Sequence, residues 1–212
     1  VIDYVRKKNP APFQATAPDA DARYAERRTL DLSKIEILVA KPDTLLNNAV
    51  PIREVAGVPI NQGSIGSCAN GRFEDIEIAA RLLQGRKVAK GVRFLISPAS
   101  QQVYLQCLKA GLVETLVAAG AQVITPGCGI CQPRVGFLSD GEVCITATTR
   151  NFKGRKGSAN AEIYLGGPLT VAAAALDTRR TLRLIEKRGQ ARDHPVLLGV
   201  PQWFATRRAT RE

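Results

Sequence analysis

Three of the five cysteines occur in patterns that could hold a metal centre. Cys68 stands in Gly-Ser-Cys-Ala-Asn-Gly-Arg, and Cys128 and Cys131 form the pair in Pro-Gly-Cys-Gly-Ile-Cys. Each motif follows a short strand-like run, residues 60–65 before Cys68 and residues 122–125 before the pair. This places all three cysteines at the carboxyl ends of strands, where ligands bind in open α/β sheets.

Three thiolates from two such loops can bind a metal and leave one coordination position open, as catalytic rather than structural sites do. An iron–sulfur cluster is one such centre, because thiolates are its usual protein ligands. The residues alone leave three alternatives open: a structural zinc site completed by another ligand, a redox-active Cys-X-X-Cys pair, or inert buried cysteines.

Two arginines are candidates for binding an anion. Arg150 and Arg155 lie five residues apart in Thr-Arg-Asn-Phe-Lys-Gly-Arg-Lys-Gly, where the glycines allow a tight loop. Two guanidinium groups that converge in this way can grip carboxylates through paired hydrogen bonds. The alternative is a solvated basic loop, because Lys153 and Lys156 stand beside them.

The remaining cysteines and the neighbours of Cys68 suggest supporting roles. Ser67 and Asn70 could donate hydrogen bonds that shape the loop and tune a metal centre, and a cap or turn role for Asn70 is an equal alternative. Cys107 and Cys144 stand among apolar residues, as free buried cysteines commonly do, and are expected to fill the core.

Elements that could position these residues alternate along the chain. We expect strands at residues 34–40, 60–67, 92–97, 122–125 and 142–148, and helices at residues 73–84, 99–110, 113–119 and 168–175. Residues 41–50 are expected to form a loop. Repeated strand–helix alternation predicts the α/β class, with parallel strands covered by helices.

Composition and charge limit the classes of protein. The 212 residues are 45% hydrophobic and contain no apolar run long enough to span a bilayer. No secretory signal opens the chain, and an odd number of cysteines clustered in motifs favours a reducing compartment, with the cytoplasm as the default. The net charge of +11 would suit nucleic acid. However, residues 179–212 hold nine Lys or Arg against three Asp or Glu, and no recognition motif is present, so nucleic-acid binding is the weaker hypothesis.

The ordered motifs resemble the aconitase superfamily, and within it the large subunits of 3-isopropylmalate dehydratases and homoaconitases. The resemblance covers roughly residues 2–176 and includes the cysteine spacing and the Arg-Asn-Phe-Lys-Gly-Arg segment. It implies a [4Fe-4S] cluster held by Cys68, Cys128 and Cys131, with Arg150 and Arg155 on the carboxylates of a hydroxy-dicarboxylate substrate. The implied reaction interconverts 2-isopropylmalate and 3-isopropylmalate by loss and addition of water, in leucine biosynthesis. Homoaconitate or aconitate chemistry is the alternative within the superfamily.

The resemblance departs from the family pattern at Ala69, Ile130 and Thr149, where Thr, Pro and Asn are usual, and these positions surround the expected ligands. The sequence contains no methionine, even at position 1, and so suggests a piece of a longer protein. The family's acid–base histidines have no counterpart here, so we expect no catalytic residue in this chain and no activity without a small, swivelling-domain subunit. The expected organisation is an irregular lead-in at 1–30, a cluster-binding region at 31–178 that could comprise two subdomains, and an atypical basic tail at 179–212.

Overall fold

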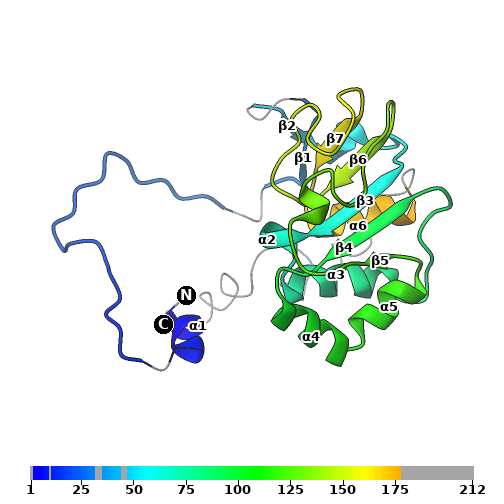
Figure 1. Cartoon of the computed structure of the whole chain (residues 1–212). Helices are drawn as coiled ribbons and strands as arrows, with labels where there is room; N and C mark the ends of the chain where they lie inside the picture. Colours follow the sequence, from blue (N-terminus) through cyan, green and yellow to red (C-terminus); the bar gives the residue numbers. More distant parts are fainter. Residues whose placement is uncertain (1, 10, 32–34, 44–46, 178–212) are drawn as a thin grey trace. The chain divides into compact units, whose positions relative to one another are not determined.

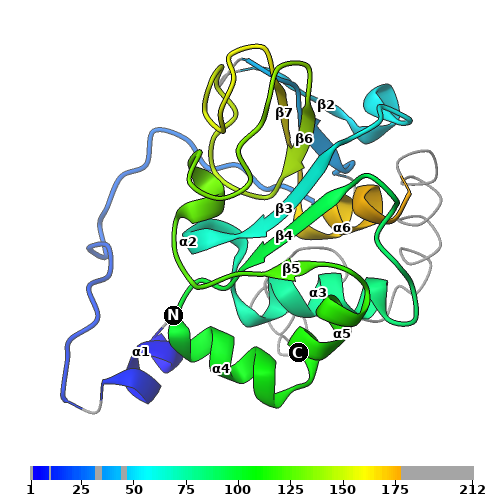
Figure 2. The same cartoon turned by 45° about the vertical axis from the view of Figure 1, so that its right-hand side comes forward.

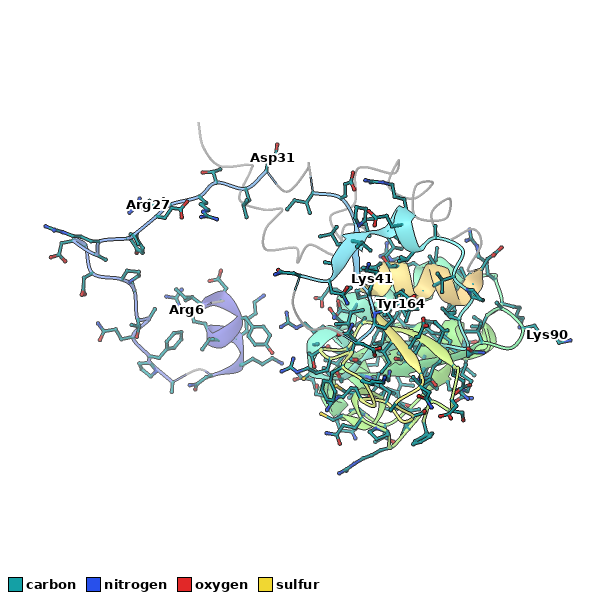
Figure 3. The ribbon with its side chains drawn as sticks, turned by 90° about the horizontal axis from the view of Figure 1, so that it is seen from above. Arg6, Arg27, Asp31, Lys41, Lys90 and Tyr164 are labelled. Atoms are coloured by element: carbon teal, nitrogen blue, oxygen red, sulfur yellow. The ribbon has the colours of Figure 1, made fainter. Side chains whose placement is uncertain are left out.

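The computed structural model describes residues 2–9, 11–31, 35–43 and 47–177, in two compact units that comprise residues 1–35 and 36–212. The described residues of the first unit include the helix α1 (Ile2–Lys8), with an acidic residue in its first turn and three basic residues in its last. These charges complement the helix dipole, and the expectation of an irregular lead-in is wrong for this segment. Further along the same unit, Arg27 lies over the ring of Tyr24, 4.9 Å from its centroid (Figure 3).

In the second unit, the described residues form a seven-stranded sheet (Figure 1). Five neighbouring strands, from one edge of the sheet to beyond its middle, are parallel to one another. At the opposite edge, the two remaining strands pair antiparallel with each other, and the inner one also pairs antiparallel with the first of the five. The strands lie in the order β2 (Ala49–Pro51), β1 (Leu38–Ala40), β7 (Glu162–Leu165), β6 (Val143–Thr146), β3 (Gln62–Gly66), β4 (Arg93–Ser97) and β5 (Gln122–Val123).

Helices cover one face of this sheet. The helix α6 (Pro168–Leu176) passes behind β3 and packs against α3 (Phe73–Leu83), which in turn contacts α4 (Gln101–Lys109) and α5 (Leu112–Ala118) (Figures 1 and 2). Alternate residues of the strands, such as Ile65, Phe94 and Ile96, point into this aliphatic core. The glycine at position 63 lets α6 lie close, since a Cβ there would stand 3.5 Å from the Cβ of Ala175 and 3.1 Å from the ring of Phe94.

Loops cover the opposite face, which is more polar. A small apolar cluster of Leu138, Cys144, Ala161 and Ile163 lies there. Beside it the strands present Gln62, Ser64 and Thr146, all fully buried. Each of these polar side chains has a hydrogen-bond partner. This polar face leads toward the carboxyl ends of the central strands.

Most expected elements are present with shorter bounds. The helix predicted at residues 73–84 is α3, with Glu74 and Asp75 in its first turn, and the proline at position 168 opens α6 as predicted. The expected strand at 34–40 is reduced to β1, and its first residue lies outside the described ranges.

Three expectations about the elements are wrong. Residues 41–50 are not only a loop, because β2 starts at Ala49 and pairs antiparallel with β1. The sheet is otherwise mostly parallel and covered by helices, which confirms the predicted α/β class. The turn between β1 and β2 has Asn47 in the left-handed region (φ 53°) and the Asn48 amide donating to the carbonyl of Lys41 at 2.6 Å. The short strand β7 was not anticipated, and residues 67–70 form a helical turn, α2 (Ser67–Asn70), where a loop was expected.

Among the described helices, none has the length and apolar character needed to cross a membrane. The basic tail predicted at residues 179–212 lies outside the described residues.

Candidate metal centre

The first cysteine motif turns sharply at the end of the central strand β3. Gly66 ends the strand with φ 136°, and a Cβ at this position would stand 2.0 Å from the carbonyl oxygen of Ser97 on β4. The chain enters α2 through Ser67, which has a left-handed φ of 59°. The Gly-Ser-Cys sequence thus places Cys68 in the first turn of α2, at the carboxyl edge of the sheet. Its side chain is exposed.

The second cysteine motif lies beside the first. Ser97, which ends β4, donates its hydroxyl to the carbonyl oxygens of Thr125 at 3.3 Å and Gly127 at 3.2 Å, and thereby holds the chain that leads to Cys128. The Cys-X-X-Cys segment then forms a short 3-10 helix, η3 (Gly129–Cys131), which contacts both α2 and β4. The two loops expected to share a metal centre are therefore neighbours at one edge of the sheet.

Arg155 contacts the buried thiol of this pair. Its Nη2 donates to the Sγ of Cys131 at 3.3 Å, and the Oγ1 of Thr149 lies 3.8 Å from the same sulfur. Burial by itself raises the pKa of Cys131, but the hydrogen bonds from Arg155 and Thr149 and the positive charge of the guanidinium outweigh it and hold that pKa below its usual value. This thiol is consequently prepared to ionise, and the thiolate is the form that binds metals.

Contacts of Asn151 and Arg155 hold the arginine motif (residues 150–155) between β6 and β7. Asn151 is buried and donates its amide to the carbonyl oxygen of Lys41, the residue directly after β1, at 2.6 Å. The guanidinium of Arg155 lies over the ring of Phe152, 5.4 Å from its centroid. Arg150, in contrast, is exposed and donates to the carbonyl of its neighbour Thr149 at 3.0 Å. Its role on a substrate stays a prediction.

The two residues beside Cys68 have different surroundings. Asn70 donates its amide to the carbonyl of Ala147 at 2.6 Å and so ties α2 to the end of β6, which is a structural use of this side chain. Ser67 is buried, and its hydroxyl has no hydrogen-bond partner among the residues that the structure describes. The Nε of Arg155 is also buried without a partner.

Such unpartnered buried groups are rare and call for an explanation. A ligand at this edge of the sheet that accepts hydrogen bonds from Ser67 and Arg155 would supply one. A sulfide-rich cluster held by thiolates has such acceptors, so the donor set and these two unpartnered donors fit an iron–sulfur cluster. A third buried atom without a partner among the described residues, the Oδ1 of Asn151, is itself an acceptor and is not explained in this way. Within the described residues, no three His, Cys, Asp or Glu side chains stand close enough to hold a single metal ion. The common ligation by Cys68, Cys128 and Cys131 therefore stays a prediction.

The other two cysteines are buried, as expected for residues that fill the core. Burial, with smaller contributions from Glu74 and Glu77, raises the pKa of Cys107 to about 11, so that it remains an uncharged thiol at neutral pH. Cys144 lies under the loops on the polar face.

Two residues near the site had no assigned role from the sequence. Thr149 was noted only as a departure from the family pattern, yet its hydroxyl lies beside the sulfur of Cys131. Lys156 entered only the alternative of a solvated basic loop, and it is fully buried instead. Nothing in the sequence indicated that this lysine would reach Thr146 on β6.

A mainly parallel sheet with thiols and a guanidinium gathered at its carboxyl edge defines an α/β domain built to bind a ligand there. The model of the aconitase family (aconitate hydratase) matches residues 46–178, and the chain belongs to this family. Enzymes of the family use an iron–sulfur cluster.

Relatives that carry specific names match the chain over most of its length. It is 48% identical to the 3-isopropylmalate dehydratase large subunit 2 of Archaeoglobus fulgidus, over 77% of this chain and 39% of the relative. It is 44% identical to the 3-isopropylmalate dehydratase large subunit 1 of Methanopyrus kandleri, over 83% and 42%. It is 42% identical to the probable methanogen homoaconitase large subunit of Methanothermobacter thermautotrophicus, over 83% and 41%. The chain thus spans about two fifths of the length of these curated relatives.

Proposed function

We propose that this chain is the cluster-bearing part of a hydro-lyase large subunit, and that Cys68, Cys128 and Cys131 together bind a [4Fe-4S] cluster. The proposed reaction is the interconversion of 2-isopropylmalate and 3-isopropylmalate by dehydration and rehydration, in leucine biosynthesis. The observation that carries the proposal is the contact of Arg155 with Cys131 beside the loop of Cys68, because it joins an anion-binding group to a thiol prepared to ionise.

The residues of this chain would perform three tasks. The cysteines would hold the cluster, which would supply Lewis-acid chemistry for the loss of the substrate's hydroxyl group. Arg155 and the more exposed Arg150 would bind the carboxylates of the substrate and orient it by paired hydrogen bonds. Ser67, whose hydroxyl is buried without a partner, would donate to the cluster and tune it.

Other tasks would fall to parts outside this chain. Its one histidine lies at position 194, outside the described residues, so none of the described residues at the site is a histidine that could transfer protons. We infer that a small subunit supplies a swivelling domain and that the complete enzyme, rather than this chain, is active. We place the cluster-binding region at residues 31–178, and we place the enzyme in a reducing cytoplasm, in keeping with five free cysteines.

A homoaconitase activity is the second candidate. It is favoured by the similarity to a relative named as a probable homoaconitase large subunit, which is nearly as high as the similarity to the dehydratases. The two activities would be separated by assaying a full-length large subunit that carries this segment, together with a small subunit. The competing substrates would be 3-isopropylmalate and homoaconitate.

Anaerobic reconstitution tests the metal centre directly. The full chain, incubated with ferrous iron, sulfide and a thiol reductant, should become brown and contain close to four irons and four sulfides per chain. Cys128→Ser and Cys131→Ser should each lose the cluster. Cys107→Ser is the matched control, because this buried thiol lies in α4, away from both cysteine loops, and its variant should retain iron. Binding of stoichiometric zinc with no iron retained would refute the proposal.

A further inference from the structure

Lys156 is a buried cationic side chain to which the proposed function assigns no role. Its side chain is fully buried on the polar face of the sheet. The amine donates to the Oγ of Ser64 at 2.6 Å and to the Oγ1 of Thr146 at 3.4 Å, and it lies 3.8 Å from the Sγ of Cys144. None of these partners is a carboxylate, and no ion pair joins Lys156 to an acidic residue of the described chain.

A buried amine in such surroundings opposes folding. Removing the charge from water is costly, and hydroxyl groups offset only part of that cost. Burial accordingly lowers the pKa of Lys156, while the thiols of Cys144 and Cys131 act in the opposite direction. Ser64 and Thr146 do not depend on the lysine for hydrogen bonding, because the Oγ of Ser64 already donates to the Oγ1 of Thr146 at 2.7 Å. An apolar side chain of similar length would therefore suit the fold better.

The position of Lys156 relates it to the metal centre. It directly follows Arg155, whose guanidinium contacts Cys131. The amine bridges the two strands that lead into the site: Ser64 belongs to β3, which continues into the Cys68 motif, and Thr146 belongs to β6, which continues to Thr149. A charge held there would lie under the edge of the sheet where the thiols gather.

We propose that Lys156 is a buried positive charge that balances the negative charge of the thiolate-bound cluster and raises its reduction potential. This inference rests on the proposed function. Three thiolates bound to a dicationic iron–sulfur core leave a net negative charge, and charges interact strongly where water is excluded. A fixed cation nearby stabilises the more negative, reduced state more than the oxidised state, and charge and hydrogen bonding near a cluster are known determinants of its potential.

The test compares two lysines of the same loop in the full, reconstituted chain. Lys156→Met removes the buried charge, and Lys153→Met removes an equal formal charge from an exposed position three residues earlier. A redox titration monitored by electron paramagnetic resonance should show a shift to lower reduction potential in Lys156→Met. The potential of Lys153→Met should stay at that of the unmodified chain, because solvent screens its charge.

A second variant separates charge from packing. Lys156→Gln keeps a hydrogen-bond donor but carries no charge, so its potential should fall as it does in Lys156→Met. Equal potentials in the unmodified chain and in both Lys156 variants would overturn the inference, and so would a shift in Lys156→Met that Lys156→Gln does not share. Failure of the unmodified chain to form a cluster would instead refute the proposed function on which the inference rests.

Discussion

Replacing Gly66 by alanine should destabilise the protein more than replacing any glycine that merely has a positive φ. Gly66 adopts φ 136° and ψ −146°, a conformation that costs a residue with a side chain about 1–3 kcal/mol. The new Cβ would also stand 2.0 Å from the carbonyl oxygen of Ser97 and 2.8 Å from its amide nitrogen. Both contacts are with backbone, so β3 and β4 would have to separate where Gly66 pairs with Ser97. We expect a total loss of about 3 kcal/mol or more.

Gly85→Ala provides the matched control. Gly85 has φ 69°, in the left-handed region, but a Cβ there would meet nothing within 4 Å. Its replacement should cost only about 1–2 kcal/mol, the price of the conformation alone. Urea denaturation of the cluster-free chain, followed by circular dichroism, measures both variants. If Gly66→Ala lost no more stability than Gly85→Ala, the close approach of β3 and β4 at the cysteine motif would be wrong.

Three further predictions concern ionisable groups. Lys156→Met should stabilise the cluster-free chain at pH 7 by about 1–3 kcal/mol; because burial lowers the pKa of Lys156 in the folded state, this gain should shrink as pH rises toward 10.5, which urea denaturation at pH 7 and pH 10 would show. Arg155→Met should raise the pKa of Cys131, so that its labelling by iodoacetamide, followed by mass spectrometry, begins at higher pH than in the unmodified chain; an unchanged profile would contradict the role of the guanidinium. Burial opposes ionisation of Glu142, but the hydrogen bond and charge of Arg93 prevail and lower its pKa, so Glu142→Gln should cost about 1 kcal/mol or less at pH 7. That cost should decline as pH falls through the pKa of Glu142 in the folded protein, and a cost that stays constant however far the pH is lowered would contradict the ion pair with Arg93.

Local signals in the sequence predicted the elements that carry them strongly. The apolar positions of residues 73–83 recur at helical spacing because one side of α3 packs against α6 and α5, so the pattern and the packing have one cause. The glycines and β-branched residues near Cys68 and Cys128 likewise predicted loops at strand ends. Parallel strands share a carboxyl edge, and the neighbourhood of the two cysteine loops follows from that geometry.

The elements that were missed depend on partners far along the chain. The strand β7 has four residues and is defined by its pairing with β6 and β1, while β2 is defined by its pairing with β1. In the site, the contacts of Cys131 with Arg155 and Thr149 join segments 24 and 18 residues apart. The inward course of Lys156 also has no sequence signal, because a lysine beside three other cations normally faces water.

The order of the strands has a consequence for the nascent protein. Synthesis proceeds from the amino terminus, and β3, β4 and β5 occupy one side of the sheet, while β6 and β7, made last, add to the other side of β3. Cys68, Cys128 and Cys131 therefore leave the ribosome before Thr149 and Arg155 do. For that interval the three thiols exist without the guanidinium that partners Cys131 and without half of the sheet beneath them. Under the proposed function, iron delivered before Arg155 emerges would meet an incomplete site, so loading belongs after this segment has emerged and β6 and β7 have joined the sheet.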